Sequence, residues 1–263
     1  MSTDLPLSPE QLLAIEKFLY TCTVPIFNGD KPKPYMHGTG VLAEFFGQVY
    51  LVSAAHVINV QKPELLGVPV NGRNAETTTL GEGMAATPGD TDRYDVGAYR
   101  IENTDVIGKL RASWTFLSEE NLPLDNEWFD LFLVAGYPDS QTTVRGKNIS
   151  AKAIQQIYTT KYDGKVDEPV DEFDLLLKYG DKVATRAGQI IRTPQLHGIS
   201  GAAVWGVRTL GSTEVWTPEK ALAMIGVQYA FHHRKYIRAK SWEVVHELLS
   251  KVRDRKGPES GSR

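Results

Sequence analysis

Between a helix-forming segment at each end, the chain consists of short apolar runs that are bounded by Gly, Pro, Asn or Asp. Runs of this length with turn residues at both ends are typical of β-strands joined by hairpins. The pattern recurs at residues 22–27, 40–46, 48–53, 95–101, 128–135, 150–158, 173–178, 190–193, 202–207 and 222–229. Because no helical pattern alternates with these runs, the sequence predicts an all-β barrel or sandwich with closed sheets.

The two ends of the chain have helix signals. Ser8, Pro9 and Gln11 stand where a helix has its N-cap, its first-turn proline and its capping-box glutamine, and they predict a short helix to about Tyr20. Residues 241–249 predict an amphipathic C-terminal helix with a serine cap, followed by a flexible tail. Residues 68–92 predict a long connection with one or two short strands, and residues 103–125 show no regular pattern.

Charge and cysteine content exclude several classes of protein. The 263 residues include 29 basic and 32 acidic side chains, and a net charge of −3 gives no field that would recruit nucleic acid or anionic lipid. With Cys22 as its one cysteine, the chain cannot form an intramolecular disulfide. The first residues lack the pattern of a secretory signal, and no apolar run is long enough to span a bilayer. We therefore expect a cytoplasmic protein without nucleic-acid or membrane partners.

Three segments contain the residue types of a nucleophilic charge system. His56 follows the apolar run 50–53, Asp95 precedes another run, and Ser200 stands between Gly198 and Gly201. A serine hydroxyl needs a base to take its proton during attack, and neutral histidine suits that task. A carboxylate orients the imidazole and stabilises the imidazolium that forms. Each residue alone is more commonly a packing or turn residue, but together they occur in the order His, Asp, Ser, which distinguishes this arrangement from the subtilisin and α/β-hydrolase orders.

These segments resemble the active-site blocks of trypsin/chymotrypsin-like serine proteases, and the resemblance spans about residues 24–251. It implies two six-stranded antiparallel β-barrels with the catalytic groups in the cleft between them. On this reading residues 1–253 are one peptidase unit, in which residues 22–112 form the first barrel, residues 126–240 the second, and residues 241–253 a C-terminal helix before the tail 254–263. The resemblance assigns the catalytic roles to His56, Asp95 and Ser200, and it makes the backbone N–H groups of Gly198 and Ser200 the oxyanion hole.

The sequence also departs from the digestive enzymes of that family. Ile199 stands where they have an aspartate that pairs with a freed N-terminus, and no Ile-Val-Gly-Gly motif occurs near the start. Ala202 and Ala203 replace the usual Gly-Pro. The blocks at residues 51–56, 136–138 and 225–227 are closer in style to bacterial intracellular peptidases of the Deg type, and we expect no PDZ domain.

The family resemblance places the primary specificity pocket around two segments. The candidate pocket residues are Pro194, His197, Gln228, Tyr229, Phe231 and His232. Because Pro194 falls where trypsin-like specificity requires an aspartate, we expect no preference for Arg or Lys before the scissile bond. These residues suggest instead a pocket for a polar or acidic substrate side chain. The alternative is that His232 and His233 are only the solvated end of a strand.

The sequence predicts a cofactor-free serine endopeptidase that acts on one or a few cytosolic proteins in regulatory, stress or defence processing. A regulatory or activator protein is a further expected partner. The histidines lack the spacing of a metal site, and no phosphate-binding glycine loop occurs. Two alternatives remain open: a catalytically silent protease homologue that serves as a binding or scaffold module, and an esterase with the same triad.

Overall fold

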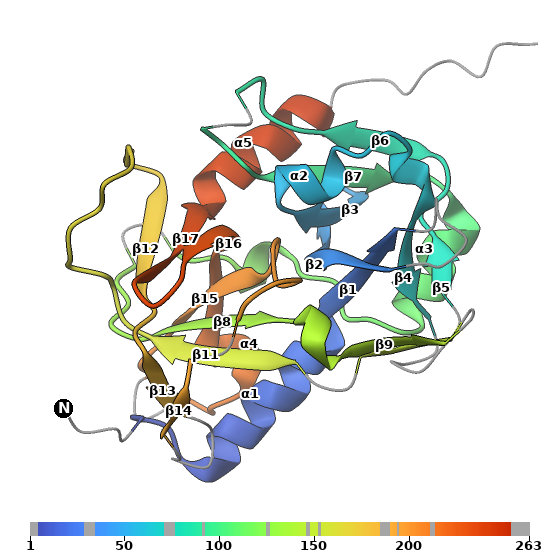
Figure 1. Ribbon diagram of the computed structural model, residues 1–263. Coiled ribbons are helices and arrows are strands. Elements are labelled where there is room, and N and C mark those ends of the chain that lie inside the picture. Colours follow the sequence, from blue (N-terminus) through green and yellow to red (C-terminus); the bar gives the residue numbers. More distant parts are fainter. Residues whose placement is uncertain are drawn as a thin grey trace, which may run out of the picture.

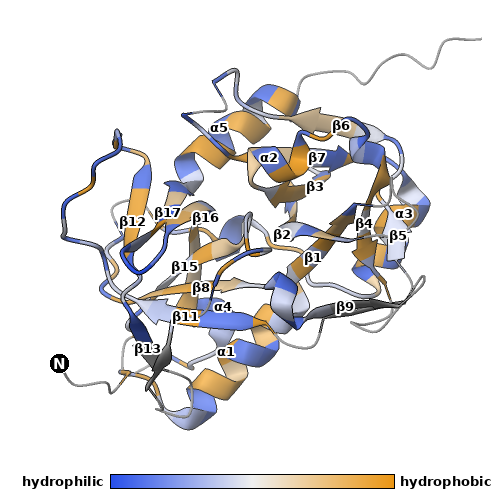
Figure 2. Cartoon of the chain, in the orientation of Figure 1, coloured by the Kyte–Doolittle hydropathy of each residue, from blue (hydrophilic) through white to orange (hydrophobic). Residues whose placement is uncertain are grey.

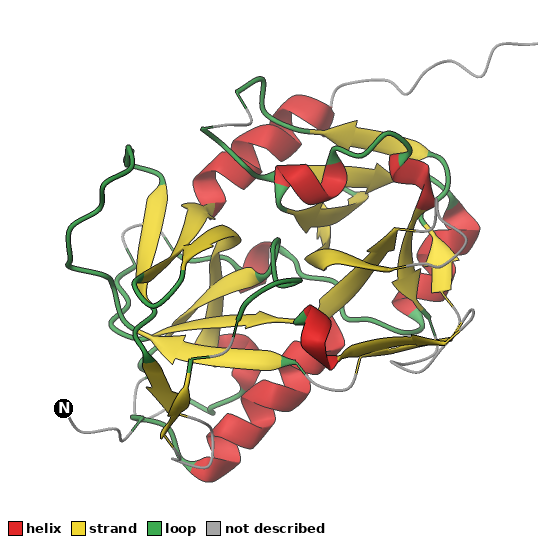
Figure 3. Ribbon diagram, viewed as in Figure 1, coloured by secondary structure: helices red, strands yellow, loops and turns green. Residues whose placement is uncertain are grey.

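The computed structural model describes residues 5–28, 35–70, 77–90, 93–124, 127–145, 148–151, 154–184, 190–193, 195–210 and 214–253. Strands account for more of these residues than helices do, with a helix near each end of the chain and short helices between the strands (Figure 3). The helices are α1 (Pro9–Cys22), α2 (Ala55–Ile58), α3 (Thr104–Arg111), α4 (Pro218–Ala221) and α5 (Trp242–Arg253). Within the described residues, none of the helices combines the length and hydropathy that a membrane crossing requires.

The first half of the chain forms an antiparallel sheet. In spatial order its strands are β5 (Thr77–Thr79), β4 (Leu66–Pro69), β1 (Thr23–Asn28), β2 (Tyr35–Phe45), β3 (Gln48–Ser53), β7 (Gly97–Ile101) and β6 (Gly83–Ala86). The described sheet thus has seven strands where the resemblance predicted six. Residues 68–92 contain β5 and β6, in agreement with the one or two short strands predicted there, and β4, which begins just before this connection, was not predicted.

The second half forms a six-stranded antiparallel sheet, as predicted. Its order is β11 (Gln155–Thr159), β8 (Phe132–Gly136), β15 (Ala203–Val207), β16 (Leu222–His232), β17 (Tyr236–Ser241) and β12 (Asp174–Lys178). Two separate hairpins are made by β9 (Thr142–Arg145) with β10 (Asn148–Ala151) and by β13 (Lys182–Ala184) with β14 (Ile190–Arg192). The two sheets curl side by side in Figure 1, and the predicted all-β, chymotrypsin-like class is confirmed. The residue limits assigned to the two barrels stay predictions.

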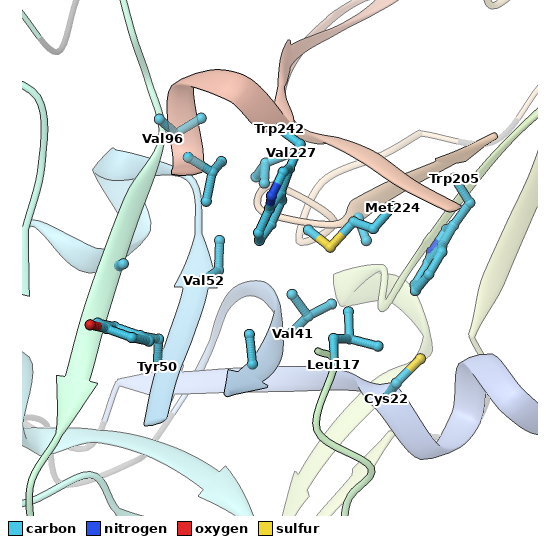
Figure 4. Packing of buried hydrophobic residues seen from close by; sticks show 14 of the residues in the cluster. Cys22, Val41, Tyr50, Val52, Val96, Leu117, Trp205, Met224, Val227 and Trp242 are labelled. Atoms are coloured by element: carbon cyan, nitrogen blue, oxygen red, sulfur yellow. The ribbon is translucent and has the colours of Figure 1, made fainter. Parts of the chain in front are cut away.

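The two sheets share one hydrophobic core in addition to a core of their own. In the shared cluster, Val41 and Val52 of the first sheet pack with Trp205 and Met224 of the second (Figure 4). Helices α1 and α5 close this cluster, and both show alternating polar and apolar residues (Figure 2). Because the two sheets bury apolar surface against each other, packing fixes their relative position.

Both terminal helices form where the sequence predicts them, but the predicted serine cap of α5 is wrong, because the Ser241 Oγ has no hydrogen-bond partner among the described residues. An internal helix was not predicted at all. The Ser8 Oγ accepts a hydrogen bond from the Gln11 N–H and the Gln11 side chain accepts one from the Ser8 N–H, which is the predicted capping box. Helix α1 continues to Cys22, slightly beyond the predicted end. Helix α3 lies in a stretch without a regular pattern and is capped by the Asn103 side chain. That cap is a local signal that the sequence analysis passed over.

Candidate active site

His56 and Asp95 are joined by two hydrogen bonds. The His56 Nδ1 lies 2.7 Å from the Asp95 Oδ2, and the backbone N–H of His56 donates to the Asp95 Oδ1 at 2.9 Å. The pairing of β3 with β7, which sets Ser53 opposite Gly97, brings the two segments together. His56 lies on α2 rather than at the end of the preceding strand, so the short helix projects the imidazole from the sheet.

The two side chains of this pair differ in exposure. The His56 side chain is 49% exposed and the Asp95 side chain is 19% exposed, so the ring has an open side while the carboxylate is sheltered. A carboxylate that accepts from Nδ1 places the imidazole proton there and leaves Nε2 able to accept a proton. This arrangement is the one that a general base requires.

The turn that contains Ser200 rests directly on the first sheet. The Thr39 N–H donates to the Ser200 carbonyl at 2.8 Å. Gly201 has a φ of +89°, and a Cβ at this position would overlap the Ser53 hydroxyl and the Thr39 carbonyl and lie 2.9 Å from the Ala54 nitrogen. Only glycine fits this conformation and this contact. The close approach brings the serine turn against the residues that immediately precede His56.

Two backbone N–H groups of the same turn are available to a ligand. Gly198 has a φ of +91°, and its carbonyl accepts from the Thr39 hydroxyl at 3.0 Å. The Thr39 Oγ1 in turn accepts from the Tyr137 N–H at 3.0 Å. Among the described residues, the N–H groups of Gly198 and Ser200 have no hydrogen-bond acceptor. A turn that is anchored through its carbonyls while two amides stay available is able to stabilise an anionic oxygen.

The Ser200 side chain is the third member of the predicted triad. Its hydroxyl makes no hydrogen bond to any residue that the structure describes. The structure therefore joins the histidine to the aspartate and places the serine turn beside them, without a bond between Ser200 and His56. Bonds of this kind tighten on substrate binding in many enzymes, so this geometry is compatible with a working nucleophile.

The predicted pocket residues are only partly brought together. Pro194 lies outside the described residues. The rings of His197 and Phe231 meet edge to face, with centroids 5.8 Å apart, and Phe231 also contacts the Tyr179 ring at 6.3 Å. These aromatic contacts link the segment before Ser200 to the end of β16.

The remaining pocket candidates have other partners. Gln228 is fully buried, and its Nε2 donates to the Ala230 carbonyl of the same strand at 3.1 Å. The Tyr229 hydroxyl donates to the Asp174 Oδ1 at 3.0 Å. His232 is exposed where β16 ends. Their part in substrate recognition stays a prediction.

Two further polar residues near the site were missed by the sequence analysis. His37, on β2, is half-buried, and burial together with the charge of His56 lowers the pKa of its imidazole. Asp139 lies so close to Gly198 that a Cβ on this glycine would overlap the Asp139 carboxylate. Burial raises the pKa of Asp139, and His197 opposes this rise. Neither residue has a local signal, since each reaches the site through contacts between distant segments.

A buried ionic network supports the loop before β7. The Lys240 ammonium lies 3.0 Å from Asp171 and 2.9 Å from Asp174, and its side chain is only 1% exposed. Asp171 also pairs with Arg93 at 3.1 Å, and the Lys240 ammonium lies 5.2 Å from the centre of the Tyr94 ring. Since the site aspartate follows Arg93 and Tyr94 directly, this network ties its loop to the second sheet.

Comparison with known proteins identifies the fold. No family model and no curated protein matches the sequence. The structure is similar to human heparin binding protein, with a TM-score of 0.56 and 16% identity over 92% of this chain and 95% of that one. It is also similar to the scabies mite inactivated protease paralogue S-I1, at 0.55 and 14% identity over 92% and 97%. A third match is the serine protease domain of the Sesbania mosaic virus polyprotein, at 0.51 and 15% identity over 87% and 92%.

These matches show a chymotrypsin-like fold. One of the similar structures is a serine protease domain and another is described as an inactivated protease. Because both kinds share the fold, catalysis depends on the residues of the site and not on the fold alone.

Proposed function

We propose that the protein is a serine endopeptidase that acylates Ser200. The double hydrogen bond between His56 and Asp95 carries this proposal, because it fixes both the orientation and the tautomer of the ring. The seating of the Ser200 turn against the residues preceding His56 supports it further. If His56 were buried and lacked these contacts with Asp95, a purely structural role for the histidine would be favoured.

The proposed reaction uses the groups in their expected roles. His56 Nε2 takes the proton of the Ser200 hydroxyl as the oxygen attacks the peptide carbonyl. The backbone N–H groups of Gly198 and Ser200 donate to the oxyanion, and Asp95 stabilises the imidazolium. His56 then protonates the leaving amine, and a water molecule activated by the same histidine hydrolyses the acyl-enzyme.

The proposed activity includes a cellular compartment and a class of substrate. We infer a cofactor-free enzyme that processes cytoplasmic proteins, of the style of bacterial Deg-type peptidases, under the control of a regulatory partner. The chain's one thiol, Cys22, is buried, and a chain without disulfides suits a reducing compartment.

A second candidate is a catalytically silent homologue that binds partners. The observation that favours it is the Ser200 hydroxyl, which has no hydrogen bond to His56 or to any other described residue. An enzyme of this class and a silent homologue differ in turnover and not in fold.

Cleavage of a peptide library and of an unfolded protein tests the proposed function. We expect cleavage by the wild type, loss of about four orders of magnitude in kcat for Asp95→Asn, and no detectable cleavage for Ser200→Ala or His56→Ala. His246→Ala, at an exposed histidine of α5, is the matched control and should retain full activity. Cleavage that survives Ser200→Ala would contradict the proposal, and a wild type that cleaves nothing would favour the silent homologue.

A further inference from the structure

The most exposed large apolar side chains of the described residues gather on one part of the surface. Trp128 is 76% exposed, and Leu124 and Val215 are each 74% exposed, whereas Val170, the next in order, is 47% exposed. Trp128 belongs to none of the described hydrophobic clusters. Contiguous exposed apolar surface of this kind, and exposed tryptophan above all, is typical of an interaction site.

Leu124 and Trp128 line a groove of about 1220 Å³, and Val215 stands between two residues that line it. The groove runs between the start of α1, the single-turn helix Glu119–Asn121, the end of β15 and helix α4, which lies beside α1 in Figure 1. The same two side chains also line an adjoining hollow toward α5. They therefore form a ridge that is accessible from both sides.

The charge of this groove differs from that of the whole chain. Its carboxylates are Glu119, Glu120, Glu127, Asp130, Glu214 and Glu219, and its basic side chains are Arg208 and Lys220. The whole chain, by contrast, has nearly balanced acidic and basic residues, 32 and 29. The lining of the groove is therefore more acidic than the chain as a whole, which favours a cationic occupant.

Arg208 holds the floor of the groove in place. Its guanidinium donates to both carboxylate oxygens of Glu127, at 2.7 and 3.1 Å, and to the Leu122 carbonyl at 2.9 Å. It also donates to the carbonyls of Lys220 and Leu222. Since Arg208 is fully engaged, it does not neutralise the other carboxylates, and the groove is preformed.

Trp128 already contacts a cation. The Lys161 ammonium lies 5.8 Å from the centre of its ring, and the indole N–H donates to the Asp130 carboxylate at 3.1 Å. The Lys161 contact shows that this indole accepts an ammonium group, and its large exposed surface beside a carboxylate suits a further lysine or arginine side chain.

The groove is separate from the candidate active site. Strand β15 starts at Ala203, just after the Ser200 turn, and ends at Val207 in the wall of the groove. A five-residue strand spans roughly 13 Å between these ends. One extended polypeptide could therefore contact both places, although binding in the groove requires no catalysis.

We propose that this groove docks a basic polypeptide segment in which lysines or arginines flank an apolar side chain. The apolar side chain packs on the ridge of Leu124 and Trp128, and the cations face the carboxylates. Nucleic acid is excluded by the sign of the charge. A symmetric contact between two copies of the chain would set these carboxylates against each other, which disfavours that occupant.

Direct binding measurements on the full chain test the proposal. The probe is a short fluorescent peptide with lysines on both sides of one leucine, and its twin has glutamates in place of the lysines. The protein is the Ser200→Ala variant, so that no cleavage intervenes and a failure of the proposed peptidase activity does not affect the result. We expect the lysine peptide alone to bind, and to bind more weakly as salt rises from about 50 to about 300 mM.

Substitutions in the groove locate the binding. Trp128→Ala should weaken binding about tenfold. Glu120→Gln combined with Glu219→Gln should weaken it and flatten its salt dependence. Asp163→Asn and Val170→Ala, at exposed positions outside the groove, are the matched controls and should bind like the parent. Because Trp128 is exposed, its substitution should leave the thermal unfolding temperature unchanged.

Three results would overturn the proposal: equal binding of the two peptides, absence of binding by the lysine peptide, or unchanged affinity in Trp128→Ala. A dimer in sedimentation that Trp128→Ala dissolves would also overturn it, in favour of a second copy of the chain as the occupant.

Discussion

Replacing Lys240 with methionine should destabilise the protein, because it leaves two carboxylates in a buried site with less compensation. The Asp174 side chain is 2% exposed and the Asp171 side chain 13% exposed, so neither can recover its hydration by a small movement. Methionine keeps the length and apolar volume of the lysine stem, so the change removes mainly the ammonium.

The size of this effect follows from the partners that remain. Removing one partner of a buried ion pair costs about 3–5 kcal/mol. Asp174 keeps a bond to Arg238 at 2.9 Å, and Asp171 keeps Arg93 at 3.1 Å, so we expect the lower end, about 3 kcal/mol. For a chain of this size, that corresponds to a fall of roughly 6–12 °C in Tm.

Urea unfolding of a small set of variants checks this reasoning. Lys178→Met removes an exposed ammonium from an exposed pair and should cost less than about 1 kcal/mol. Adding Asp171→Asn to Lys240→Met should recover about 1 kcal/mol or more, because it removes a carboxylate that lost its buried partner and whose remaining partner, Arg93, is half-exposed. A loss below about 1 kcal/mol in Lys240→Met, or no recovery in the double variant, would refute the claim that the network is held by this ammonium.

Three further predictions concern Cys22, His37 and Gly201. Burial raises the pKa of Cys22 to about 12, so iodoacetamide at neutral pH should modify this thiol only after unfolding, and rapid native-state labelling would contradict its position. The pKa of His37 is lowered below its ordinary 6.5, so the folded state binds fewer protons than the unfolded state and loses stability as pH falls through 6.5; unfolding at pH 7 and pH 5 should show a smaller difference in His37→Gln, and an unchanged difference would be contrary evidence. Gly201→Ala should cost about 3 kcal/mol, since its Cβ would overlap the Thr39 carbonyl at a positive φ, whereas Gly89→Ala, which meets open space, should be nearly neutral; equal unfolding curves would disprove the tight seating of the turn.

The fold class was predictable because its signals are local. The Ser8 capping box depends on neighbouring residues alone, and the predicted limits of β3 agree with the structure. Helix α2 was missed because it is a single turn that follows an apolar strand directly. Strand β4 was not predicted, because its pairing with the distant strand β1 decides whether so short a segment becomes a strand.

The candidate site was predictable only as separate segments. The apolar run before His56 and the glycines around Ser200 gave the sequence blocks, and the resemblance to a known family gave their roles. The contact of Gly201 with Thr39 and the position of Asp139 beside Gly198 join segments far apart in the chain. No local pattern reports such contacts, because they depend on how the two sheets pack.

Mass spectrometry after treatment with a fluorophosphonate probe tests the central claim most directly. We predict one adduct per chain, on Ser200, which is absent in Ser200→Ala and His56→Ala and present in the His246→Ala control. Such labelling requires a serine that is activated by the histidine. An intact, folded protein without the adduct, or an adduct that persists in His56→Ala, would contradict the proposed nucleophile and base.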